Sequence, residues 1–168
     1  RVNSVNVNPM GVAFGSYSVN YERLFGGYNG LLVEATYSSM GSGDDQSTGY
    51  GGIIGYRFHW GGKQNSGFLG LNFGYQTGTG TAVVSTPAGS EKFEMDISQV
   101  SVVPNIGKRW AWDYGLNITL RFGVGYGDWK ITSDAKTDNA KKAVELLDEL
   151  LNLFPVALDG ELSVGWNF

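Results

Sequence analysis

The sequence predicts an all-β fold, an eight-stranded antiparallel up-and-down barrel with one amphipathic helix in the last long loop. Two observations carry this prediction. Apolar and polar residues alternate with a period of two in one segment after another, as in strands with two different faces. Short and long connections also alternate along the chain, as they do in up-and-down barrels. The 168 residues have the length of a single domain, so residues 1–168 are expected to form one barrel domain.

The last segment, residues 156–168, is the clearest strand. Its apolar parity contains Val156, Leu158, Leu162, Val164, Trp166 and Phe168. Its polar parity contains Asp159, Glu161, Ser163, Gly165 and Asn167. In a soluble sheet the apolar face meets a core, whereas in a membrane barrel it meets lipid and the polar face fills the lumen.

Five earlier segments repeat this alternation and are predicted as strands. They are residues 17–25, 31–37, 50–60, 69–77 and 115–130. The polar parity of the last of them is rich in glycine. A narrow barrel must accommodate the inward side chains of all its strands, so glycines on that parity favour a barrel.

The segment 92–110 is less regular. Phe93, Met95 and Ile97 share one parity, whereas the apolar residues that follow take the other. Those residues are Val100, Val102, Pro104 and Ile106. Two interpretations fit: a bulge near Ser98 and Gln99, or a strand that rises above a membrane before it changes register.

The strand count follows from the connections. Three look short (26–30, 61–67 and 112–115), and three look long (41–48, 78–91 and 131–155). The C-terminal strand descends from a long loop, so the chain ends on the side of the short turns. If the N-terminus lies on that side too, one more strand precedes residue 17, and residues 2–8 are the candidate. This gives eight strands, an even number that can close.

The last long connection is predicted to contain a helix at about 134–153. Ser133 or Asp134 can cap its N-terminus, and Pro155 ends it. Apolar residues recur at helical spacing in one stripe: Ala143, Leu146, Leu147, Leu150, Leu151 and Phe154. An exposed stripe needs a cover. The helix either caps the barrel mouth or lies on the outer leaflet, or it packs against a neighbouring protomer or a partner protein.

The grouping of aromatic residues near strand ends favours a membrane barrel, because such rings sit at both membrane interfaces. The membrane-interface candidates are Trp60, Trp110, Trp112, Tyr126, Trp129, Trp166 and Phe168. A soluble lipocalin-like barrel, the alternative, has no reason to group them and would purify without detergent. We therefore expect the outer membrane of a Gram-negative bacterium, with the signal peptide already removed from this chain.

Composition excludes several classes of function. The chain has no cysteine, so neither a disulfide framework nor a thiolate metal site can form. Its net charge of −4 argues against nucleic-acid binding. The acidic residues at 44–45 and 134–138 lack regular ligand spacing, so no metal site and no cofactor are predicted.

The charged residues on the inward parity are candidates for ion pairs in the lumen. They are Glu22, Glu34, Arg57, Arg109, Arg121, Asp159 and Glu161. Pairing about the 41–48 loop places Glu34 near Arg57, and alignment of the last two strands places Arg121 near Glu161. Buried charges persist when they are paired, and eight strands leave a lumen that side chains just fill. The pattern therefore favours a closed lumen over a gated ion path.

His59 is the only histidine and the only candidate for a catalytic base. A lipid deacylase would need a serine within hydrogen-bond reach and an acid to orient the imidazole. Such sites face lipid near the outer leaflet, whereas His59 has inward parity beside a short turn. The position favours a structural histidine, and no catalytic residue and no enzyme activity are predicted.

The chain resembles the small eight-stranded outer-membrane barrels, the family that includes the OmpA transmembrane domain and OmpX. The resemblance rests on the strand count, Asn-Pro-x-Gly at residues 8–11, the Tyr21-Glu22 pair and the terminal Gly165-Trp166-Asn167-Phe168. It implies insertion by the barrel assembly machinery, which reads C-terminal strands of this kind. It implies no shared activity.

Three hypotheses of function follow. The first is a non-enzymatic barrel with a structural or interaction role, embedded among outer-membrane lipids. Its outward stripe and helix allow lateral self-association into a homo-oligomer that encloses lipid. The second is a small pore or carrier for ions or hydrophobic molecules. The third, a lipid-modifying enzyme built around His59, is disfavoured by the position of that residue.

Overall fold

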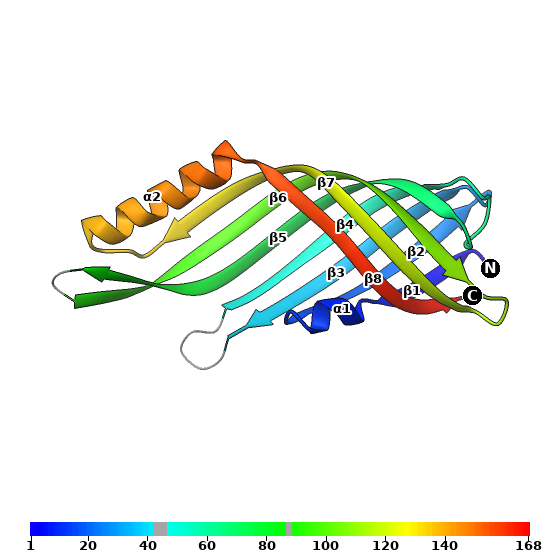
Figure 1. The fold of residues 1–168 in the computed structure, drawn as a ribbon, viewed down its shortest axis with the longest axis horizontal. Coiled ribbons are helices and arrows are strands. Elements are labelled where there is room, and N and C mark those ends of the chain that lie inside the picture. Colours follow the sequence, from blue (N-terminus) through cyan, green and yellow to red (C-terminus); the bar gives the residue numbers. More distant parts are fainter. Residues whose placement is uncertain (42–46, 87–88) are drawn as a thin grey trace.

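The computed structural model describes residues 1–41, 47–86 and 89–168 and forms a closed antiparallel barrel of eight strands in sequence order. The expected barrel fold is therefore confirmed (Figure 1). The elements are β1 (Asn3–Val7), α1 (Pro9–Val12), β2 (Ser16–Phe25), β3 (Asn29–Met40), β4 (Ser47–His59), β5 (Gly67–Thr86), β6 (Gly89–Ala111), β7 (Leu116–Ser133), α2 (Asp138–Leu153) and β8 (Val156–Asn167). Among the described residues, no helix is long and apolar enough to cross a membrane.

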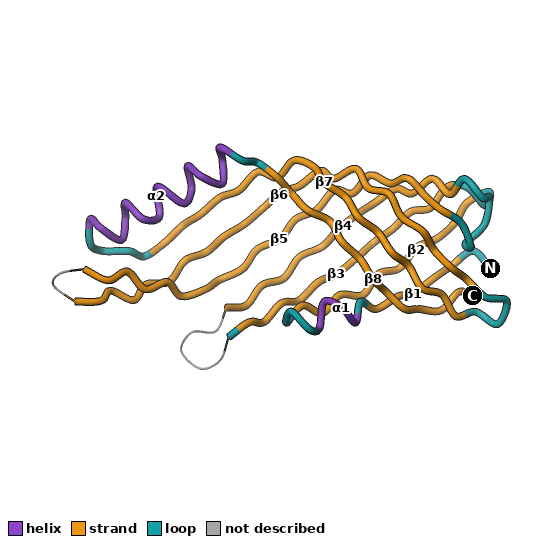
Figure 2. The backbone as a smooth tube through the Cα atoms, in the orientation of Figure 1, coloured by secondary structure: helices purple, strands orange, loops and turns teal. Residues whose placement is uncertain are grey.

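The barrel wall has very different heights around its circumference. Both chain termini and the short turns lie at one end (Figure 1). At the other end β5, β6 and β7 project beyond the remaining strands, and α2 runs alongside them (Figure 2). Strand β6 has 23 residues, whereas β1 has only 5. The barrel is therefore high on the β5–β6–β7 side, here called the extension, and low where β8 meets β1.

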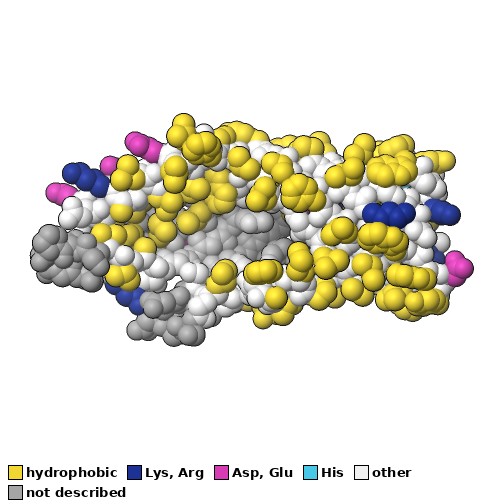
Figure 3. Space-filling model, in the orientation of Figure 1, with side chains coloured by type: hydrophobic (Ala, Val, Ile, Leu, Met, Phe, Trp, Pro, Cys, Tyr) yellow, Lys and Arg dark blue, Asp and Glu magenta, His cyan; other side chains and the backbone are white. Residues whose placement is uncertain are grey.

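The side chains are distributed inside out relative to a soluble protein. Among the described residues most buried side chains are polar or charged, whereas large apolar side chains cover the outside (Figure 3). Exposed tyrosines lie toward the extension: Tyr17, Tyr37, Tyr50, Tyr75 and Tyr126. Exposed aromatic residues also lie beside the turns near the termini: Phe25, Tyr28, Phe58, Trp60, Trp110, Trp112, Trp166 and Phe168. The outer surface therefore has an apolar belt that is bordered at each end by a band of aromatic residues.

The extension contradicts the predicted loop at 78–91 and settles the pairing of the irregular segment 92–110. Residues 78–91 are not a long loop, because β5 continues to Thr86 and β6 begins at Gly89. The pairing of β5 with β6 runs without a shift from Gly67 opposite Lys108 to Thr86 opposite Gly89, so there is no bulge and no change of register. The glycine- and threonine-rich sequence resembles a loop, but its cross-strand partners hold it as a hairpin.

The two faces of β6 exchange their character along this unbroken strand. Near the turns the exposed face is apolar, with Ile106 and Trp110, and the inward face is polar, with Asn105 and Arg109. In the extension the inward parity becomes apolar, and Phe93 is 5% exposed. The alternation is therefore inverted along the strand without any change in its pairing with β5.

Helix α2 begins later than the sequence suggests. Its N-cap is Thr137, whose hydroxyl accepts a hydrogen bond from the Ala140 N–H. Ser133 is still the last residue of β7, and the Asp134 carboxylate instead accepts a hydrogen bond from the Glu94 N–H at 2.8 Å. The predicted start at 134 is therefore wrong, whereas the end at Leu153 before Pro155 agrees.

The predicted apolar stripe of α2 is divided between two environments. Ala143, Leu147 and Leu151 are half-buried, and Ala140, one turn earlier, is completely buried. Leu146, Leu150 and Phe154 are 66%, 54% and 62% exposed. One edge of the stripe therefore packs on the barrel, and the other edge remains on the surface.

A carboxylate on the extension secures the start of α2. Glu91 of β6 accepts hydrogen bonds from the Thr137 hydroxyl and from the Lys136 N–H, the latter at 2.8 Å. The Thr137 hydroxyl, followed by the Lys136 N–H, lowers the pKa of Glu91. Because charged Glu91 is the better acceptor, this contact favours the folded loop only while the carboxylate is ionised.

We expect the attachment of α2 to weaken in acid. A lowered folded pKa means that the stabilisation is complete above the ordinary pKa of glutamate, near 4.5, and is lost as the pH falls through the lowered value. Hydrogen–deuterium exchange of residues 138–153, corrected for intrinsic pH dependence, should show loss of protection in that range. Glu91→Ala should show the same loss at pH 7, whereas Glu145→Gln, on the exposed side of α2, should not. Unchanged protection in Glu91→Ala would contradict this role.

Candidate functional site: a buried charge network and two lumen cavities

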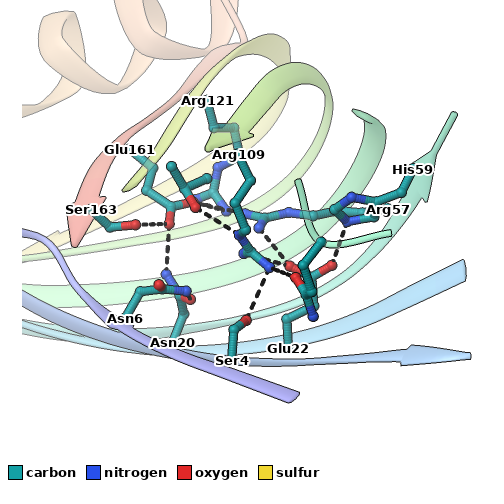
Figure 4. A network of polar contacts seen from close by, with 12 residues as sticks. Ser4, Asn6, Asn20, Glu22, Arg57, His59, Arg109, Arg121, Glu161 and Ser163 are labelled. Carbon is teal, nitrogen blue, oxygen red and sulfur yellow. Dashed lines mark hydrogen bonds and ion pairs between the residues drawn. The ribbon is translucent and has the colours of Figure 1, made fainter. Parts of the chain in front are cut away.

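The inward charges form one network across the half of the lumen nearest the termini. We call Glu22, Glu34, Arg57, His59, Arg109, Arg121, Asp159 and Glu161 the lumen network. Its members come from six strands, so the residues meet only because the barrel is closed (Figure 4). Each points inward because it has the parity opposite to the exposed apolar residues of its own strand.

Glu22 is the centre of the lumen network. Its Oε2 lies 2.8 Å from Arg57 Nη1 and 2.8 Å from Arg109 Nη2, and its Oε1 lies 2.7 Å from His59 Nε2. The Glu22, Arg57, Arg109 and His59 side chains are all completely buried. A carboxylate with three such partners is held in one position, and its charge is balanced at short range.

The pairing of opposite walls continues through Glu161 and Arg121. Arg57 Nη2 lies 2.7 Å from Glu161 Oε2, and Arg121 Nη1 lies 3.0 Å from the same oxygen. Arg121 Nη2 lies 2.8 Å from Asp159 Oδ1 and 3.1 Å from Glu34 Oε2. All seven charged candidates from the sequence thus lie in one connected set together with His59.

One expected pair is wrong and another is found. Arg121 is opposite Glu161 in the β7–β8 pairing, as the sequence suggests. Glu34 is opposite Ile53 in the β3–β4 pairing, and its ion-pair partner is Arg121 rather than Arg57. The predicted pair of Glu34 with Arg57 was wrong because the centre of the 41–48 loop does not give the register of β3 and β4. Residues 42–46, with the acidic residues Asp44 and Asp45, lie outside the described residues.

Neutral side chains complete the lumen network. Arg109 donates to Thr119 at 2.9 Å, to Ser4 at 3.0 Å and to Gln64. Asn20 donates to Glu161 at 2.9 Å. None of these neutral residues was among the predicted site residues. The available signal was their inward parity or, for Gln64, its place in a short turn. Glycines provide the space, because a Cβ at Gly30 would overlap the Glu22 carboxylate.

His59 has the two neighbours that catalysis would require, a serine and an acid. Its Nδ1 lies 2.9 Å from Ser66 Oγ, and its Nε2 contacts Glu22. The Ser66 hydroxyl, however, donates to the Lys63 carbonyl at 2.8 Å, and both Ser66 and His59 are buried. Neither residue lines either of the lumen cavities described below. The arrangement connects the 61–67 turn to the lumen network.

Two cavities lie above the lumen network, toward the extension. The lower one, of about 140 Å³, is lined by carboxylates, amides and hydroxyls that include Glu34, Asp159 and Asn72. The upper one, of about 330 Å³, has Met40 and Ile97 among its lining residues. Both are lined by Thr36, Gln76 and Gln99, so they are adjacent parts of one space.

Trp129 belongs to the upper cavity and not to a membrane interface. It is opposite Gln99 in the β6–β7 pairing and shares the inward parity of Arg121. Its indole is half-buried and lines the upper cavity. The prediction of an interface role for Trp129 is therefore wrong, because nearness to a strand end does not decide which face a residue occupies. Trp60, Trp110, Trp112, Tyr126, Trp166 and Phe168 are exposed on the outer surface.

Among the described residues, no group of three or more histidine, cysteine, aspartate or glutamate side chains is arranged to hold a metal ion. Comparison with known proteins does not name a family for this barrel: no family model matches the chain, and no curated protein matches it significantly.

Proposed function

We propose that this protein is a non-enzymatic integral barrel of the bacterial outer membrane, with a structural or interaction role and a lumen closed to ions. The observation that carries the proposal is the inside-out distribution of side chains. An apolar belt bordered by two bands of aromatic residues is stable in lipid. In water the same belt would leave an extensive apolar surface exposed. The proposed partners are outer-membrane lipids and, during insertion, the barrel assembly machinery.

The lumen network supports the closed state. Glu22, Arg57 and Arg109 come from different sides of the lumen, and all three are completely buried. The Glu22 Oε2 atom lies 2.8 Å from a guanidinium nitrogen of each arginine. An ion that crossed this layer would have to separate buried pairs that have no water to replace them. Eight strands also enclose a space that side chains just fill.

The extension and α2 support an interaction role. They project from the belt on the side away from the chain termini (Figure 1). The exposed edge of α2 carries Leu146, Leu150 and Phe154, and Phe154 lies two residues before the start of β8. Such an edge suits contact with the outer leaflet or with a second barrel, so lateral self-association around enclosed lipid remains part of the proposal.

We expect purified protein to insert into liposomes and to pass no discrete ionic current. The measurement is flotation of proteoliposomes on a density gradient, followed by planar-bilayer recording of the same preparation at 1 M salt. Insertion with a flat current trace is the expected result. Regular current steps would contradict the closed lumen, and protein that stays in the aqueous fraction without detergent would contradict the membrane location.

A further inference from the structure

We propose that the two lumen cavities bind a single-chain amphiphile with an ammonium head group, which enters sideways from the membrane at the seam between β8 and α1. The route rests on the proposed membrane location. The site itself rests on the cavities and their charges, which can be tested in detergent.

The seam between β8 and α1 is the weakest part of the barrel wall. Strand β1 pairs with β8 only from Ser4 opposite Asn167 to Val7 opposite Val164. The outer part of β8, from Val156 to Ser163, has pairs only with β7 among the described strands. Instead of a longer β1, the four-residue helix α1 follows Val7, and a helix gives no ladder of hydrogen bonds to the strand beside it.

The lower cavity reaches the outer surface at this seam. Its lining includes Ser16 and Ser18 from one side of the seam and Leu158 and Gly160 from the other. Leu158 faces outward and is 74% exposed, so a residue of the apolar belt also borders the lumen cavity. The molecular surface is hollowed between β8 and α1 (Figure 3). An unpaired strand edge at membrane depth is tolerated where it borders such a cavity.

The two lumen cavities together form a space with an apolar upper end and a charged lower end, as an amphiphile requires. The upper cavity is bordered by Met40, Met95, Ile97 and Trp129. Its volume of about 330 Å³ lies within the range of about 300–1,000 Å³ typical of small-molecule sites. The half-buried indole of Trp129 supplies an apolar face against which the alkyl chain can lie.

The floor of the space selects a cation. Glu34 and Asp159 line the lower cavity, whereas Arg121, which binds both, is not part of the lining. The lumen network has four carboxylates and three guanidinium groups, and its two remaining arginines bind Glu22 and Glu161 farther from the cavity. The face toward the cavity therefore presents carboxylate oxygens and the amide of Asn72, which suit an ammonium donor.

Contact quenching of Trp129 tests the site directly. In W60F/W110F/W112F/W166F, which replaces four exposed residues, Trp129 is the only tryptophan. Dodecylamine brominated at the chain end should quench its fluorescence saturably in non-ionic micelles, and the matched bromododecanol should bind about tenfold more weakly. Asp159→Asn should weaken binding of the amine about tenfold and leave the alcohol unchanged. Absence of saturable quenching, or equal binding of amine and alcohol, would overturn the site.

The lateral route has its own test in liposomes that already contain the brominated amine. A Cβ at Gly160 would meet no atom within 4 Å, so Gly160→Phe should fold and place a ring at the seam. It should slow quenching at least fivefold. Gly52→Phe places the same ring on β4, where a Cβ meets only the Glu34 carbonyl at 3.4 Å, and should not slow it. Equal rates would overturn the route. Flotation and bilayer current, measured separately, decide the proposed function independently of quenching.

Discussion

Glu22→Ala is expected to destabilise the barrel by about 3–5 kcal/mol, because it leaves buried charges without their partner. Arg57 and Arg109 each lie 2.8 Å from Glu22, and His59 lies 2.7 Å from it. All of these side chains are completely buried, so water cannot replace the lost carboxylate without entering the lumen. The substitution therefore removes the shared partner of two buried guanidinium groups and of the His59 ring.

Urea unfolding in lipid vesicles, followed by tryptophan fluorescence, measures this loss. Glu149→Gln is the matched control, because Glu149 is exposed on α2 and should change stability little. Glu22→Gln keeps the shape and some hydrogen bonds of the side chain, so its stability should fall between that of the wild type and Glu22→Ala. A Glu22→Ala barrel as stable as the Glu149→Gln control would show that the lumen network does not hold the wall together.

Ile54→Arg is expected to destabilise the protein by about 2–4 kcal/mol in lipid, because it places a charge on the lipid-facing belt. Ile54 is 68% exposed on β4 and lies between Val33 and Phe73 on the neighbouring strands. On a soluble barrel an arginine at so exposed a position would be nearly neutral or would improve solubility. The substitution therefore separates the two interpretations of the same alternating pattern.

Thr48→Arg is the control for this prediction. Thr48 is exposed on the same strand and the same parity, beyond the exposed Tyr50 at the edge of the belt. An arginine there would lie in water or at the interface, and it should cost about 0–1 kcal/mol. The measurement is again urea unfolding in vesicles. Equal stability of the two variants would contradict membrane insertion of the belt.

The sequence predicted the strands well where one environment surrounds the whole strand. Residues 156–168 lie in β8 almost as expected, because their apolar parity is constant. Residues 115–130 lie in β7, and their apolar parity is constant as far as Tyr126. Prediction failed where the surroundings change along one strand. Residues 78–91 look like a loop when read alone, whereas in the structure they complete β5 and begin β6. Cross-strand pairing, which has no local signature, decides such segments.

The candidate site was predictable in composition but not in contacts. Parity identified the inward charges, because in this barrel the face opposite the exposed apolar residues points into the lumen. It did not place Trp129, whose inward parity was outweighed by its nearness to a strand end. It also missed Gln64 and Ser66, which belong to a turn and have no alternating pattern to identify them.

The strand faces, and with them the inside-out character of the barrel, follow from the period-two pattern, because each residue's face depends only on its neighbours along the same strand. The ion pairs do not. Arg57 on β4 meets Glu161 on β8, 104 residues away, and Arg109 on β6 meets Glu22 on β2, 87 residues away. Closure of the barrel brings these walls together, and the uneven strand lengths leave the seam at α1. Both depend on the register and length of every strand at once, which no local stretch of sequence contains.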